Sequence, residues 1–249
     1  MEKNRILNID ICSVSLDDLL KTLKKGVVVT PNVDHLVKLQ RDPEFYEAYS
    51  QAEWVICDSN ILNLSSRLFL GTSFKEVIPG SSFLPAYYTY HKDNEAVKIF
   101  LLGAAEGVAA EAMKRINAKT GREIVVGAMS PSFGFEKKDE ECARIIETVN
   151  RSGANVLVIG VGAPKQEKWL LKYKSQLPGI DIFMALGATI DFEAGNIKRA
   201  PEWIQRLHIE WLYRIAQEPE RLWRRYLIDD PAFFIMILKQ RFRLYRNPF

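Results

Sequence analysis

The sequence is poor in the residues that build disulfide frameworks and metal sites. Its 249 residues include three cysteines, Cys12, Cys57 and Cys142, and three histidines. The cysteines are widely spaced and form no CxxC pair, so we expect reduced thiols and a cytoplasmic protein. The histidines show no metal-ligand spacing, so no metal site is expected.

Long apolar runs and a strong charge of one sign are also lacking. No run reaches the ~20 residues that span a bilayer, and the N-terminus lacks the apolar segment of a signal peptide. The net charge of +3 does not by itself indicate a nucleic-acid partner. The charge is unevenly spread, however, because residues 198–249 hold eleven Lys and Arg against six Asp and Glu.

Short apolar segments rich in β-branched residues recur along most of the chain. Several are nearly continuous rather than alternating, which is typical of strands covered on both faces. The expected strands are 26–30, 54–58, 97–103, 123–128, 155–162 and 181–187. Helical spacing lies between them at 106–121, 139–153 and 164–179. This alternation predicts an α/β, Rossmann-like fold with a largely parallel sheet flanked by helices.

The character of the sequence changes near residue 198. Tryptophans there alternate with arginines, and Pro219 and Pro231 divide the segment into about three helical pieces. We therefore predict an α/β domain over residues 1–197 and a basic, aromatic-rich helical C-terminal appendage over residues 198–249.

Ligands of a parallel sheet gather at the carboxyl ends of its strands, and the richest turn there is "GVGAPKQEKW". Gly160 and Gly162 allow the backbone to approach a ligand, and the start of a helix attracts phosphate. Lys165 adds a further donor, and Gln166 can hold a sugar hydroxyl or a uracil edge. The alternative is a tight strand–helix turn with a solvated polar start, and this motif alone does not decide between them.

The turn "LGAAEGVA" at residues 102–109 is a weaker candidate. Gly103 and Gly107 follow a strand and precede a helix, but G-x-G-x-x-G is absent. A glycine-tolerant turn is the favoured interpretation. A nicotinamide-dependent oxidoreductase would rest on this turn alone.

Two further strand ends carry polar residues. In "VICDSN", Asp58 follows a buried strand, where partial burial raises a carboxylate pKa toward neutrality and suits a general base. The residues alone favour a second role, an N-cap for a helix starting near Ile61. In "TPNVDH", Thr30 and Asn32 precede His35, and a lone histidine more often makes a local hydrogen bond than catalyses.

Taken in order, "TPNVDH", "CDSN", "LGAAEGVA", "GVGAPKQEKW" and "KRAPEW…EWLYR…EPERLWRRY" resemble the WecG/TagA/CpsF glycosyltransferase family, over residues 5 to 228. The resemblance implies an inverting transferase that moves N-acetylmannosamine or another hexose from a UDP-sugar to a polyprenyl-diphosphate-linked sugar. Such enzymes build teichoic acid linkage units or exopolysaccharide. The resemblance implies neither a cofactor nor a metal. It also implies that the protein associates with the inner face of the cell membrane through the appendage. Whether the protein forms a homo-oligomer is left open.

The resemblance also assigns roles to individual residues. It makes Asp58 the general base and Thr30 and Asn32 its neighbours in the catalytic pocket. The expected substrate-binding residues are Gly103, Gly160, Gly162, Lys165, Gln166, Asp191, Arg214, Arg221 and Arg224.

The sequence departs from the family pattern at three positions. Ser59 follows the aspartate where the family usually has glycine, and Val77 and Ser82 stand where it usually has arginine and aspartate. These changes bear on the choice of donor sugar. They also motivate an alternative hypothesis, a catalytically reduced binding or scaffold protein of a polysaccharide assembly complex.

Overall fold

A six-stranded parallel sheet forms the centre of the molecule. The computed structural model describes residues 2–197 and 228–249 and, between these ranges, residues 201, 204, 213, 220 and 223. The strand order is β4-β3-β8-β7-β5-β6, and each neighbouring pair runs parallel. The strands are β3 (Gly26–Val29), β4 (Trp54–Val55), β5 (Ile99–Gly103), β6 (Val125–Met129), β7 (Val156–Gly160) and β8 (Ile182–Ala185). The predicted Rossmann-like α/β fold is confirmed.

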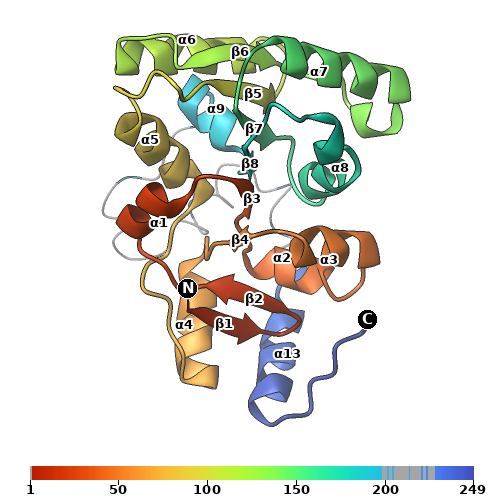
Figure 1. The fold of residues 1–249 in the computed structure, drawn as a ribbon. Helices are drawn as coiled ribbons and strands as arrows, with labels where there is room; N and C mark the ends of the chain where they lie inside the picture. The colour runs from red at the N-terminus through yellow and green to blue at the C-terminus, as the bar shows by residue number, and fades with distance from the viewer. Residues whose placement is uncertain are drawn as a thin grey trace.

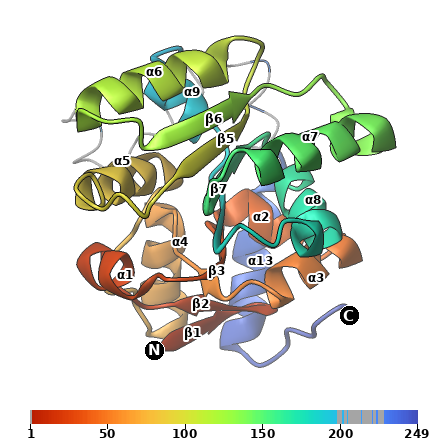
Figure 2. The same cartoon turned by 45° about the horizontal axis from the view of Figure 1, so that its top comes forward.

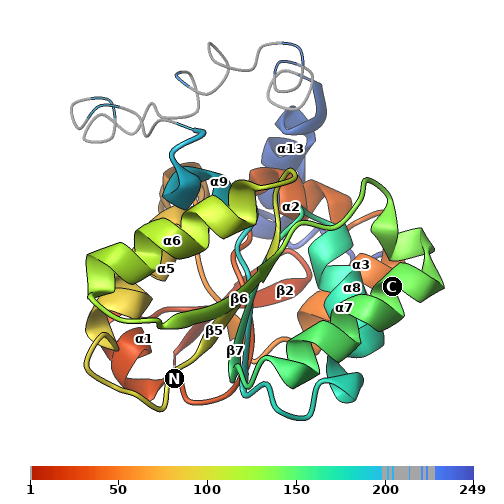
Figure 3. The same ribbon diagram turned by 90° about the horizontal axis from the view of Figure 1, so that it is seen from above.

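Helices cover both faces of this sheet, as the view from above shows (Figure 3). One face carries α1 (Leu16–Thr22), α5 (Gly80–Tyr90), α6 (Val108–Thr120) and α9 (Thr189–Ala194). The other carries α2 (Val33–Lys38), α3 (Pro43–Ser50), α7 (Asp139–Arg151) and α8 (Lys165–Tyr173). Shorter helical turns are η2 (Phe135–Lys137) and η3 (Lys174–Gln176).

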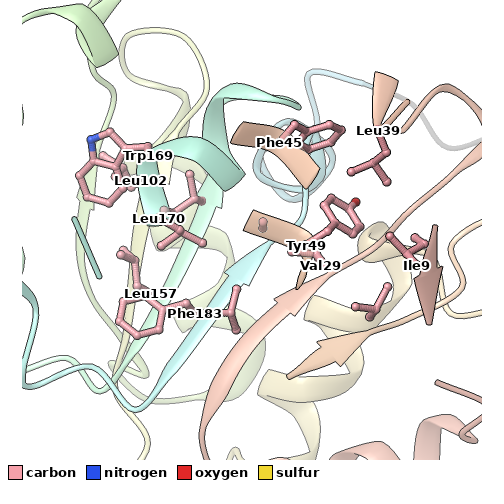
Figure 4. Packing of buried hydrophobic residues seen from close by; sticks show 14 of the residues in the cluster. Ile9, Val29, Leu39, Phe45, Tyr49, Leu102, Leu157, Trp169, Leu170 and Phe183 are labelled. Atoms are coloured by element: carbon pink, nitrogen blue, oxygen red, sulfur yellow. The ribbon is translucent and has the colours of Figure 1, made fainter. Parts of the chain in front are cut away.

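Because helices cover both faces of the sheet, its strands are nearly continuous apolar runs. Within β3, Val27 and Val29 belong to one buried cluster and Val28 to the other. The first cluster joins strand residues to α3 and α8, where Tyr49 and Trp169 are almost fully buried (Figure 4). Burying each large side chain contributes about 1.5–3 kcal/mol, so neither face of a strand can be polar.

One predicted strand is much shorter than expected. A strand is expected over residues 54–58, but β4 ends at Val55, and Ile56 forms an isolated bridge with Cys12. The carbonyl oxygen of Cys57 accepts a hydrogen bond from the N–H of Ile78 at 2.8 Å. The N–H groups of Ile56 and Asp58 still donate to the carbonyl oxygens of Val29 and Pro31, at 2.9 and 3.3 Å, so this segment lies between the end of β3 and the residues that lead into α5.

The sequence patterns did not reveal the antiparallel hairpin of β1 (Lys3–Ile6) and β2 (Ile9–Cys12). It lies between α4 (Asn60–Ser65) and α13 (Pro231–Arg241) (Figures 1 and 2). Gln240 of α13 joins the hairpin, because its Nε2 donates to the carbonyl oxygen of Arg5 and its Oε1 accepts from the N–H of Leu7.

The described part of the C-terminal segment packs into the first part of the chain. Phe233 and Ile237 of α13 are fully buried in the cluster that contains α2 and α3, and α13 also contacts η1 (Ser66–Leu70). The division at residue 198 stays a prediction. Among the described residues, no helix combines the length and apolar character needed to cross a membrane.

Candidate functional site

Parallel strands bring their carboxyl ends to one edge of the sheet, and this edge collects the predicted residues. Asp58 follows β4, Thr30 and Asn32 follow β3, and Asp191 lies in the first turn of α9 after β8. Gln166 follows β7. The edge therefore joins turns that lie far apart in the sequence, at the place where α/β sheets bind ligands.

Asp58 is not the helix cap that its residue type favours. The cap of α4 is Ser59, whose Oγ accepts from the N–H of Leu62 at 3.4 Å. The Asp58 carboxylate is partly buried and its Oδ1 accepts from the N–H of Gly80 at 3.0 Å, at the start of α5. Ser59 thus takes over the capping role, and the aspartate is oriented by a different helix.

Three glycines at this edge are in close contact. A Cβ on Gly103 would lie 2.5 Å from the carbonyl oxygen of Gly160, and one on Gly160 would lie 2.7 Å from the carbonyl oxygen of Gly187. Glycine is therefore required at Gly103 and Gly160 by the packing of neighbouring turns. Gly162 differs, because a Cβ there meets nothing within 4 Å and its φ of +84° is what favours glycine.

Gln166 joins two of these turns. Its side chain is 2% exposed, and its Oε1 accepts from the N–H groups of both Gly162 and Gly187 at 3.2 Å. Its Nε2 donates to Oε1 of Glu167 at 2.9 Å. The sequence suggested a direct contact to a sugar hydroxyl or uracil. That contact stays a prediction, and the described contacts add a second role, in which Gln166 links the turns after β7 and β8.

A buried polar cluster lies behind this link. The Tyr49 hydroxyl lies 2.7 Å from Nδ1 of His35, which confirms a local hydrogen-bonding role for that histidine. Burial, followed by the charges of Glu167 and Asp58, raises the pKa of Tyr49 well above its ordinary value. The tyrosine therefore stays protonated, close to carboxylates from two different turns.

The remaining predicted residues of this edge have varied surroundings. Thr30 is buried, and the side-chain oxygen of Asn32 caps α2 by accepting from the N–H of His35 at 3.2 Å. Lys165 opens α8, and its Nζ lies 4.6 Å from the ring centroid of Phe133. Phe133 is 93% exposed in the turn after β6, a turn that no sequence motif marks.

A pocket of about 530 Å³ borders the β7–α8 turn. It contains the Asp34–Lys38 ion pair, whose Oδ2 and Nζ are 2.8 Å apart. Its lining residues are Asp34, Val37, Lys38, Arg41, Asp42, Pro43, Pro164 and Asp229. The pocket therefore offers both signs of charge next to the turn that precedes Gln166.

Three predicted residues, Arg214, Arg221 and Arg224, lie outside the described residues. Within the described ranges, no group of three or more His, Cys, Asp or Glu side chains is placed to hold a metal ion. The three cysteines are buried and free of disulfides, as expected.

A parallel Rossmann-like sheet with glycine turns and an oriented carboxylate at its carboxyl edge is typical of α/β proteins that bind nucleotide-containing ligands there. The particular family follows from comparison of sequences. The model of the "Glycosyl transferase WecG/TagA/CpsF family" matches residues 4–247, so the chain belongs to this family of glycosyltransferases.

A curated relative is similar over most of both chains. It is the N-acetylglucosaminyldiphosphoundecaprenol N-acetyl-beta-D-mannosaminyltransferase of Bacillus spizizenii (strain ATCC 23059 / NRRL B-14472 / W23). The identity is 27% over 216 residues, which is 87% of this chain and 80% of the relative.

Proposed function

We propose that this protein transfers N-acetylmannosamine, or a related hexose, from a UDP-sugar to a sugar carried on polyprenyl diphosphate, with inversion at the anomeric carbon. The relative's name supports the transferred sugar and the lipid-linked acceptor. The placement of Asp58 carries the proposal within this chain, since a carboxylate oriented at the ligand edge suits a general base.

The proposed reaction uses Asp58 as the base. Its carboxylate takes the proton of the acceptor hydroxyl, and the oxygen attacks the anomeric carbon. The bond from that carbon to UDP breaks on the opposite face, and UDP leaves with the electron pair. No cofactor is needed for this step, and the start of α8 with Lys165 supplies donors for the leaving diphosphate.

Substitution of Asp58 tests this assignment. Asp58→Asn keeps an oxygen that can accept from Gly80, so the local geometry is retained while the base is lost. We expect turnover to fall about 100- to 10,000-fold, with UDP-sugar binding nearly unchanged. Asp17→Asn, an exposed carboxylate of α1, is the matched control. Wild-type turnover by the Asp58 variant would remove Asp58 from the mechanism.

The scaffold hypothesis stands as the alternative, motivated by Val77 and Ser82. Val77 packs against the hydrophobic cluster, and the Ser82 N–H donates to the carbonyl oxygen of Pro79 at 2.9 Å. Nothing in the structure explains why these residues replace arginine and aspartate. Transfer by the purified protein, in a panel of UDP-sugars with a polyprenyl-diphosphate-linked N-acetylglucosamine acceptor, would end the scaffold hypothesis. No transfer from any donor would overturn the proposed function.

The proposal includes contact with the inner membrane face, where the acceptor is anchored. Exposed apolar side chains lie on neighbouring elements, Leu68 on η1 and Ile235 and Leu238 on α13. Basic residues accompany them in and after α13: Lys239, Arg241, Arg243 and Arg246. Apolar side chains among cations suit the boundary of an anionic bilayer. We define this apolar and basic set as the α13 face.

A further inference from the structure

Glu167 is a buried carboxyl group that the proposed mechanism does not use. Its side chain is 2% exposed, although it lies in the first turn of α8. Oε1 accepts from Gln166, and Oε2 is a buried oxygen with no hydrogen-bond partner in the described structure. An unpartnered buried polar oxygen is destabilising. Stability alone therefore does not account for a glutamate at this position.

The contacts of Gln166 show what Glu167 can determine. A carboxylate only accepts hydrogen bonds, so it turns the Gln166 amide NH₂ toward itself. The amide oxygen then faces the opposite way and meets the N–H groups of Gly162 and Gly187. One carboxylate thereby sets the orientation in which a single oxygen ties two turns of the ligand edge.

Protonation of Glu167 weakens this constraint, because a neutral carboxyl still accepts from Gln166 but the hydrogen bond is no longer strengthened by charge. A neutral carboxyl can donate to the Gln166 oxygen, and a rotated amide then presents its NH₂ to the N–H groups of Gly162 and Gly187. Donor would then face donor on both turns, so this rotation costs both ties, and a carboxylate, which cannot donate, excludes it. The charge on Glu167 therefore strengthens the orientation in which Gln166 ties the two turns.

The surroundings place this ionisation close to neutral pH. Burial raises the pKa of Glu167 to about 7, opposed in part by the hydrogen bond from Gln166 and the charge of Lys38. The other titratable groups facing this cluster are Asp34, His35, Tyr49 and Asp58.

We propose that Glu167 is a positioning residue of the donor edge, whose carboxylate orients Gln166 to tie the turn after β7 to the turn after β8. The position of the ties is a property of the folded protein. Their consequence for the donor rests on the proposed function, because these turns border the expected UDP-sugar site.

The tie is tested first without any ligand. Wild-type protein labelled with ¹⁵N-glycine is titrated from pH 5.5 to 8.5, and the amide resonances of Gly162 and Gly187 are followed. We expect both to shift with one midpoint near pH 7. Glu167→Gln keeps the size and an acceptor for Gln166 but cannot ionise, so both resonances lose this midpoint. Glu147→Gln, an exposed glutamate of α7, is the matched control and keeps it.

The inference would be overturned if the wild-type resonances of Gly162 and Gly187 did not shift with pH, or if Glu167→Gln showed the same midpoint. Donor binding gives the functional readout. If only the ionised form binds, the apparent Kd for a UDP-sugar rises up to about tenfold between pH 8 and pH 6 in the wild type. Glu167→Gln loses this dependence. A glycine midpoint without binding of any UDP-sugar would leave the tie standing and refute the proposed function instead.

Discussion

Glu167 makes a quantitative prediction about stability. Its pKa of about 7 in the folded protein lies about 2.5 above its ordinary value of 4.5. Between these values the folded state binds more protons than the unfolded state, so unfolding becomes easier as pH rises. The contribution of Glu167 is fully present below pH 4.5 and is lost as pH rises through about 7.

The magnitude follows from the size of that difference. Each pKa unit corresponds to 1.36 kcal/mol, so the free energy of unfolding falls by about 3 kcal/mol in all. About 2.5 kcal/mol of this fall lies between pH 5 and pH 8. Glu167→Gln removes this loss because an amide does not titrate. We therefore expect the wild type to lose about 2.5 kcal/mol relative to Glu167→Gln over this range.

Urea unfolding of both proteins at pH 5, 6, 7 and 8 measures this difference directly. Glu147→Gln should follow the wild type, since that glutamate is exposed and paired with Arg151. Parallel stability curves for the wild type and Glu167→Gln would refute the assigned ionisation. The expected result would mean that the protein gives up stability at neutral pH for an oriented Gln166.

Two other predictions rest on packing and on the exposed surface. Gly160→Ala should lower the free energy of unfolding in urea by about 1–3 kcal/mol, because its Cβ would meet a carbonyl oxygen. Gly179→Ala should lower it much less, since the atom nearest to its Cβ would be 3.9 Å away. Equal losses in the two variants would contradict the glycine contact. Ile235→Ser with Leu238→Ser should reduce co-sedimentation with anionic vesicles severalfold at unchanged melting temperature; full binding by this double variant would exclude the α13 face.

Most of the central sheet and its flanking helices could be predicted from local patterns. The strand at 155–162 and the helix at 106–121 each appear within two residues of their observed bounds, and that helix ends at Gly121 with φ of +71°, as predicted. Such elements follow from apolar runs, helical spacing and a glycine stop, which neighbouring residues encode. Local patterns could not predict that the hairpin packs against α13, because Gln240 and Arg5, which form the hydrogen bond between them, lie near opposite ends of the sequence.

The candidate site was predictable in its position but not in its contacts. Glycine and carboxylate turns at strand ends do lie along one edge of the sheet, as expected, and the binding and catalytic roles of the residues there stay predictions. Sequence reasoning passed over Glu167 because a glutamate in the first turn of a helix is ordinary. The signal that could have raised the question was its place in the turn "GVGAPKQEKW", directly beside Gln166.

The sequence by itself determined the alternation of strands and helices, the turns at the ligand edge and the family. The tertiary structure decided which atoms meet there. Asp58 and Ser59 are both good helix caps, and only the approach of Gly80 separates their roles. Likewise, the sequence shows a polar Gln166 in its turn, and only the structure brings Gly187, from the turn after β8, to its oxygen. Hydrogen bonds between distant turns depend on how the strands are ordered, and local sequence does not encode that order.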